Sequence, residues 1–101
     1  MSAVNITKAN FLSEVIHCDK PVLMDFWAPW CGPCRMVGPV VEEIAAERAD
    51  IKVCKVNVDE QPELAGQFGV MSIPTLVVIK NGKIVRQAVG ARPKSAIVAM
   101  L

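Results

Sequence analysis

Residues 21–34 read PVLMDFWAPWCGPC, and this stretch decides the fold. Its first seven residues are apolar except for Asp25 and follow a Lys20-Pro21 step that ends the preceding element. A short apolar run of this kind is typical of a strand buried on both faces of a sheet. Cys31 and Cys34 then open a helix that we expect to extend to about residue 49. Its inner stripe is formed by Val37, Val40, Val41, Ile44 and Ala45.

Strands and helices alternate on both sides of this unit. Apolar runs predict strands at 4–6, 51–58, 75–79 and 84–89, and Asn81-Gly82 predicts a tight hairpin turn between the last two. Apolar spacing and breakers predict helices at 7–20, 61–68 and 93–101. The order β-α-β-α-β-α-β-β-α predicts an α/β fold, with a mixed central sheet and helices on both faces. No linker divides the sequence, so we expect a single domain over 1–101.

The composition argues against several classes of function. The chain has 101 residues, a net charge of +1 and scattered basic residues, so nothing favours nucleic acid or an anionic membrane as partner. No apolar run is long enough to span a bilayer, and residues 1–10 lack the pattern of a secretory signal. We therefore expect a cytoplasmic protein. Four cysteines in such a chain are more often catalytic, metal-binding or buried than paired in structural disulfides.

The spacing of Cys31 and Cys34 favours reversible disulfide chemistry. Residues three apart at a helix start lie one turn from each other, so the two sulfurs can bond. Cys31 is expected at the N-cap, where free backbone amides and the helix dipole favour its thiolate. We expect Cys34 to be more covered, so that Cys31 attacks a substrate disulfide and Cys34 resolves the mixed disulfide. Pro33 stiffens the intervening loop and Gly32 leaves room for a substrate chain, and both should tune the redox equilibrium.

A metal site is the alternative interpretation of the same cysteines, because zinc and iron–sulfur sites take four ligands. The other soft candidates are His17, Cys18 and Cys54, and they form no second motif with ligand spacing. We expect Cys54 to be buried and inert, and Cys18 to be more exposed.

Asp25 is the one charged residue in the predicted central strand. Burial would disfavour its ionised form and raise its pKa, giving an acid or base poised nearer neutrality. The alternative is a structural aspartate whose carboxylate is bonded to a backbone amide.

Taken together, the sequence resembles the thioredoxin family from about Phe11 to the C-terminus. The resemblance rests on Trp30-Cys31-Gly32-Pro33-Cys34 after the Asp25 strand, on Ile73-Pro74-Thr75 and on Gly90-Ala91. It implies the thioredoxin fold and a redox-active Cys31–Cys34 disulfide with no bound cofactor and no metal.

The resemblance also implies roles for single residues. Asp25 would be the buried acid that helps Cys34 to lose its proton, and Lys55 would be its charged partner rather than an ordinary surface lysine. The Ile73-Pro74 bond would be cis and packed against the cysteines. Ile73, Pro74, Gly90 and Trp30 would then form the platform on which an extended client segment is bound.

The implied function is protein-disulfide reduction that contributes to cell redox homeostasis. Electrons would come from a thioredoxin reductase, expected to be an NADPH-dependent flavoprotein, and pass to disulfides of client proteins. We expect a monomer that binds neither nucleic acid nor membrane. Two alternatives are a thioredoxin-like interaction module without turnover, and an oxidase or isomerase of the same fold. The intact cysteine pair argues against the first, and the Gly32-Pro33 dipeptide resembles the reducing members.

Overall fold

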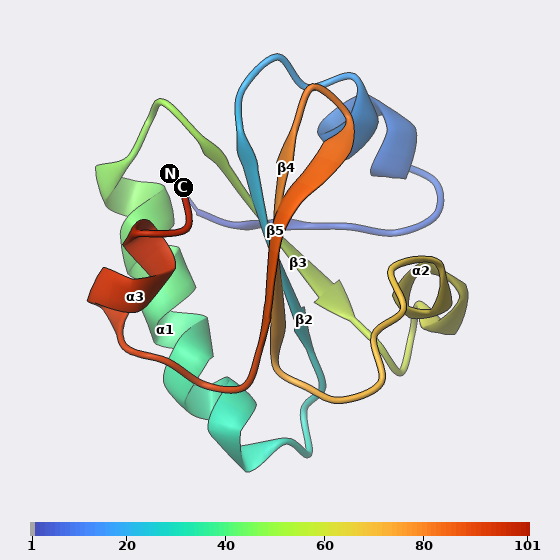
Figure 1. Cartoon of the computed structure of the whole chain (residues 1–101). Coiled ribbons are helices and arrows are strands. Elements are labelled where there is room, and N and C mark those ends of the chain that lie inside the picture. Colours follow the sequence, from blue (N-terminus) through green and yellow to red (C-terminus); the bar gives the residue numbers. More distant parts are fainter. Residues whose placement is uncertain (1) are drawn as a thin grey trace.

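The computed structural model describes residues 2–101 and has the predicted order of elements (Figure 1). The strands are β1 (Val4–Asn5), β2 (Val22–Trp27), β3 (Lys52–Asn57), β4 (Thr75–Lys80) and β5 (Lys83–Val89). The helices are η1 (Leu12–Ile16), α1 (Gly32–Glu47), α2 (Pro62–Gln67) and α3 (Lys94–Val98).

The five strands form one mixed sheet in the order β1-β3-β2-β4-β5. β1, β3 and β2 run parallel, whereas β4 pairs antiparallel with both β2 and β5. Helices α1 and α3 cover one face, and η1 and α2 cover the other (Figure 1). The mixed sheet with helices on both faces, predicted from the order of elements, is therefore confirmed.

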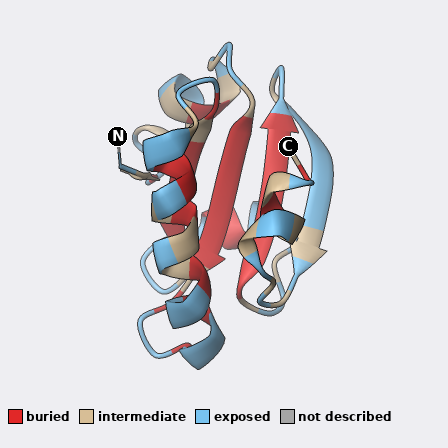
Figure 2. Cartoon of the chain, turned by 90° about the vertical axis from the view of Figure 1, so that its left-hand side faces the viewer, coloured by how far each residue is buried: buried red, intermediate tan, exposed pale blue. Residues whose placement is uncertain are grey.

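Strand β2 lies at the centre of the sheet and is buried on both faces. Its residues from Val22 to Phe26 are at most 1% exposed. Leu23 packs into the cluster beneath α1 and α3, whereas Met24 and Phe26 belong to the cluster on the η1 and α2 side. Because both faces of β2 are buried, its sequence is apolar apart from Asp25 rather than alternating. Figure 2 shows the buried strands behind α1 and α3, whose outward-facing surfaces are largely exposed, and the exposed edge strand β5 beside them.

The first helix differs from its prediction. Apolar spacing indicates a helix between Thr7 and Lys20, but the structure has a single wide turn, η1, closed by the His17 N–H donating to the Leu12 carbonyl oxygen at 2.9 Å. Leu12, the first residue of η1, is 60% exposed, while Val15 is fully buried. A bond spanning five residues widens the turn and rotates its side chains away from the spacing of an α-helix. None of the helices within residues 2–101 is long and apolar enough to cross a bilayer.

Candidate active site

Three loops meet at one end of the sheet because of the strand register. β2 ends where β4 begins, since Phe26 pairs with Thr75, and Thr75 in turn pairs with Val89 at the end of β5. The loop after β2, the Ile73-Pro74 segment before β4 and Gly90 after β5 therefore lie close together. A hydrogen bond from the Gly90 N–H to the Pro74 carbonyl oxygen, at 2.8 Å, ties two of these loops together.

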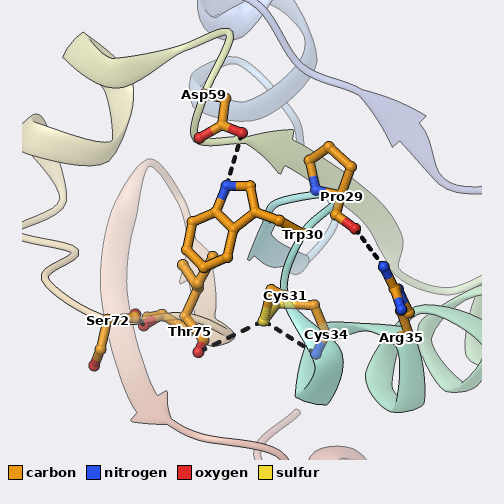
Figure 3. Close-up of a disulfide and its surroundings, with 9 residues drawn as sticks. Pro29, Trp30, Cys31, Cys34, Arg35, Asp59, Ser72 and Thr75 are labelled. Carbon is orange, nitrogen blue, oxygen red and sulfur yellow. Dashed lines mark hydrogen bonds between the residues drawn. A yellow bond between two sulfur atoms is a disulfide. The ribbon is translucent and has the colours of Figure 1, made fainter.

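The two cysteines lie in the first of these loops and at the start of α1, where they form a disulfide (Figure 3). Cys31 is the N-cap of α1, as predicted, with extended backbone angles. Its Sγ accepts a hydrogen bond from the Cys34 N–H at 3.2 Å. Pro33 has no N–H to satisfy, and a proline fits the first turn of a helix for that reason. One sulfur thus caps a helix end whose free amides favour negative charge.

The exposure of the two cysteines corrects one expectation. Cys34 was predicted to be more covered than Cys31, but both residues are 4% exposed. Cys31 is covered from outside the helix, because it packs in a cluster with Ala28 and Ile73, and its Sγ lies 3.9 Å from the Ile73 carbonyl oxygen. The two sulfurs therefore differ in their surroundings rather than in their exposure.

The Asp25 side chain is fully buried, and neither carboxyl oxygen has a hydrogen-bond partner within residues 2–101. The alternative of a carboxylate bonded to a backbone amide is therefore wrong. Burial raises the pKa of Asp25 from 3.8 to about 6, and the positive charge of Lys55 only partly opposes this. Asp25 is thus buried, as expected, in an environment that raises the pKa of its carboxyl.

Lys55 is paired with Asp25 in the register of the parallel strands β2 and β3. Its ammonium group does not form an ion pair with that carboxylate among the described residues; its Nζ lies 4.8 Å from the centre of the Trp27 ring. The Lys55 ammonium group therefore acts on Asp25 from beyond ion-pair distance, and it makes a cation–π contact with the Trp27 ring. A groove of about 410 Å³ is lined by Lys55, Cys34 and Glu42. Cys34 is therefore open to this groove on the side of Lys55.

The residues expected in the client platform surround the other side of the disulfide. Trp30 is 67% exposed, and its indole N–H donates to Oδ2 of Asp59 at 2.9 Å (Figure 3). The Ile73-Pro74 bond is cis, as the resemblance implied. Trp30 and Ile73 line a groove of about 430 Å³ whose rim carries Met71, which is 98% exposed. Asp59 was missed at the level of sequence because a single exposed acid in a loop carries no signal of the residue it bonds.

Two glycines keep the surface beside the disulfide open. A Cβ at Gly32 would meet no atom within 4 Å, so the predicted free space above the loop is present. Gly90 has φ of +97°, a conformation that side-chain-bearing residues rarely adopt.

The remaining cysteines are free thiols outside this site. Cys18 is half-buried, and Cys54 is fully buried in β3. Burial raises the pKa of the Cys54 thiol to about 12, so this sulfur is a poor nucleophile. Within residues 2–101 no three His, Cys, Asp or Glu side chains are grouped to hold a metal ion.

A disulfide-bonded cysteine pair at a helix start, with an open apolar platform next to it and a buried acid in the preceding strand, is typical of a dithiol–disulfide oxidoreductase. The thioredoxin family model matches residues 2–101. The chain is 53% identical to a thioredoxin of Pyropia yezoensis, covering all of this chain and 95% of that protein. It is 55% identical to thioredoxin 1 of a Nostoc species and 54% identical to a thioredoxin of Alicyclobacillus acidocaldarius, covering at least 95% of this chain and at least 91% of each relative.

The chain belongs to the thioredoxin family. It is a protein-disulfide oxidoreductase with reductase activity, and its redox-active group is the Cys31–Cys34 disulfide of the protein itself. Family membership implies two kinds of partner, which are client proteins with disulfides and a thioredoxin reductase.

Replacing Asp25 by Asn should stabilise the fold at neutral pH. A pKa raised from 3.8 to about 6 means that the folded protein binds a proton that the unfolded chain has lost. The resulting cost is absent below about pH 3.8, grows as the pH rises, and levels off above about pH 6 at about 3 kcal/mol. Urea unfolding of the wild type and Asp25→Asn at pH 4 and pH 7.5 measures it. The free energy of unfolding of Asp25→Asn relative to the wild type should be higher at pH 7.5 than at pH 4. The same difference at both pH values would show that burial does not disfavour the ionised carboxylate.

Cys18 and Cys54 should differ in reactivity and should not pair. Iodoacetamide should label Cys18 in the native, oxidised protein and leave Cys54 unlabelled, because Cys54 is fully buried and has a raised pKa. Both thiols should be labelled after unfolding in urea, and this control shows that Cys54 reacts with iodoacetamide once it is exposed. Peptide mapping without reduction that found Cys18 linked to Cys54, or equal labelling of both in the native protein, would contradict this.

Proposed function

We propose that Cys31 is the attacking and Cys34 the resolving thiol in reduction of client disulfides. The Cys31 thiolate attacks one sulfur of the client disulfide, a bond forms between the two, and the second client sulfur leaves as a thiolate that takes up a proton. The Cys34 thiolate then attacks Cys31 Sγ and expels the first client sulfur. Two electrons pass to the client, and the Cys31–Cys34 disulfide of the structure is the product.

The observation that carries this assignment is the hydrogen bond from the Cys34 N–H to Cys31 Sγ at the N-terminus of α1. A charged sulfur accepts such a bond more strongly than a neutral one, so the helix end lowers the cost of the Cys31 thiolate. Cys31 also contacts Ile73 in the client platform, whereas Cys34 lines the groove on the Lys55 side. These different surroundings support attack on the client disulfide by Cys31, and attack on the mixed disulfide by Cys34 from the side of Lys55.

Asp25 is proposed as the base that takes the proton of Cys34, directly or through water. Both of its oxygens lack partners within residues 2–101, and a pKa of about 6 leaves it mostly ionised at neutral pH and able to accept a proton. Lys55 acts on Asp25 as a positive charge that favours the ionised form. Lys55 is therefore a positioning and tuning residue for Asp25 rather than a group that touches the client.

The client segment is proposed to lie across Trp30, Ile73, Pro74 and Gly90. An extended chain here can pair with the backbone at Ile73, as in strand addition, and bury an apolar side chain against Trp30.

Gly32 and Pro33 are proposed to tune the redox equilibrium by setting the space and stiffness of the loop between the sulfurs. The open space at Gly32 supports this role.

The oxidised protein needs two electrons to react again, and an NADPH-dependent flavoprotein is proposed as the reductase that supplies them. A flavin accepts a hydride and passes two electrons to a disulfide, so its chemistry fits this demand.

We further propose a single-domain monomer that acts in the cytoplasm. The free thiols of Cys18 and Cys54 are consistent with a reducing compartment.

Single replacements of the two cysteines should give different products. Cys31→Ser should abolish reduction of a client disulfide, and Cys34→Ser should retain attack and accumulate a mixed disulfide. Mass spectrometry of each variant after incubation with a disulfide-bonded peptide measures the adduct, and Cys18→Ser is the matched control. An adduct formed by Cys31→Ser through Cys34 would reverse the proposed roles.

Asp25→Asn should slow resolution of the mixed disulfide without abolishing attack. Without the base, Cys34 loses help in shedding its proton, and a loss of roughly a hundred- to ten-thousand-fold is expected near pH 7. Single-turnover kinetics across pH 5–8 should show a wild-type rate that rises through the Asp25 titration and a variant rate that lacks this rise. Asp19→Asn, at an exposed acid in the loop before β2, is the control. Equal pH profiles for the wild type and Asp25→Asn would remove Asp25 from the mechanism.

A further inference from the structure

A third groove adjoins the redox centre on the side away from Trp30. It has a volume of about 360 Å³ and lies between α1 and the loop that joins β5 to α3. It is lined by Met36, Val40, Ala91, Arg92 and Pro93. None of these residues belongs to the proposed catalytic machinery or to the client platform.

This groove begins where the platform ends. Met36 follows Cys34 by two residues on α1, and Ala91 directly follows Gly90. Gly90 donates its N–H to the Pro74 carbonyl oxygen, and the residue before Pro74 contacts Cys31. A client chain that crosses the disulfide from the Trp30 side therefore continues toward this groove.

The walls of the groove are apolar and adaptable. Met36 is 72% exposed although its side chain is large and apolar. An unbranched thioether adapts to apolar side chains of different shape, as in other promiscuous binding surfaces. The exposed Ala91 and Pro93 add apolar surface that a bound side chain would cover.

Arg92 brings to this groove a positive charge that lacks a carboxylate partner. Five ion pairs are formed within residues 2–101, and none includes Arg92. One Nη2 hydrogen bond to the Val89 carbonyl oxygen, at 3.3 Å, holds the guanidinium in place, while its buried Nε has no partner among the described residues. Lys94, two residues further on, is by contrast bound by Glu43 and Glu47. A planar guanidinium presents donors that match a carboxylate.

The opposite side of the disulfide carries the opposite charge. Exposed Asp59 and Glu60 lie at the Trp30 side, where Asp59 binds the indole. A client chain with an acidic residue on one side of its cysteine would thus be attracted toward Arg92 and repelled by Asp59. The two sides together define an orientation for the chain.

We propose that the groove at Met36 and Arg92 binds the part of the client polypeptide next to its reacting cysteine. An apolar client side chain packs against Met36, and a neighbouring client carboxylate is bound by Arg92. This inference rests on the proposed function, because it places the client across the Cys31–Cys34 centre. It makes Arg92 a specificity-determining residue that favours client disulfides flanked by an apolar and an acidic residue.

The test uses synthetic peptides with one intramolecular disulfide and a Leu-Glu, Leu-Gln or Leu-Lys pair placed before or after the first cysteine. The second-order rate constant for oxidation of the pre-reduced protein by each peptide is followed by tryptophan fluorescence. In one placement the wild type should react with the Leu-Glu peptide about three-fold faster than with Leu-Gln, as expected for a charge pair at the rim of an interface. Arg92→Gln should remove this preference, and Arg92→Glu should reverse it in favour of Leu-Lys.

Arg86→Glu is the matched control, since it changes the net charge equally from an exposed position on β5 that shares no groove with Met36. It should keep the wild-type preference. The preference should also shrink in 0.5 M NaCl, where charges are screened over a few ångströms. Met36→Gln should lower the rates of all the Leu peptides relative to matched Ala peptides while keeping the Glu-to-Lys order.

Equal Glu-to-Lys ratios in Arg92→Glu and Arg86→Glu, in both placements, would overturn the inference. Failure of the wild type to reduce any of the peptides would overturn the proposed function instead. Circular dichroism of each variant establishes that it is folded before its rates are compared.

Discussion

The hydrogen bond from the Cys34 N–H to Cys31 Sγ joins the fold to the chemistry. The residue that begins α1 is also the residue whose sulfur reacts, so the helix cannot be positioned without positioning the sulfur. Strand β2, fully buried in the centre of the sheet, fixes the point from which the loop and α1 start. The register of β2 with β4, and of β4 with β5, then brings Pro74 and Gly90 to the same end. A rigid, two-sided core thereby supports a short reactive loop, as precise chemistry requires.

The same strand contains the least favourable group of the core. Asp25 occupies a fully buried position whose neighbours in the strand are apolar, and neither of its oxygens is bonded within residues 2–101. An apolar residue of similar size would avoid this desolvation, so packing alone gives no reason for a carboxyl group here. Its raised pKa and the nearby charge of Lys55 are physically consistent with a group that exchanges protons during turnover. The structural cost and the proposed chemical role are therefore concentrated at one position of β2.

Sequence patterns predicted the sheet, the order of elements and the Cys31 cap, because each depends on local signals: apolar runs, breakers and the position of a cysteine before Pro33. They failed where the outcome depends on contacts between distant segments. Leu12 is exposed because η1 closes through a wider turn than apolar spacing indicates. The equal burial of the cysteines results from Ile73, which is 42 residues away from Cys31. The positions of Lys55 over Trp27 and of Asp59 on Trp30 likewise depend on how strands and loops meet, and no local pattern encodes them.

Low exposure of the sulfurs has a consequence for selectivity. With Cys31 and Cys34 each 4% exposed, a client disulfide reaches the reactive atoms only when its chain lies closely on the surface around them. Besides the groove that Cys34 lines with Lys55, that surface includes two apolar grooves, each with an exposed methionine, and with Asp59 on one side and Arg92 on the other. The net charge of +1 conceals this local separation of sign. If the client docks there as proposed, binding energy gained in the grooves aligns its disulfide with Cys31, so that differences in docking become differences in rate.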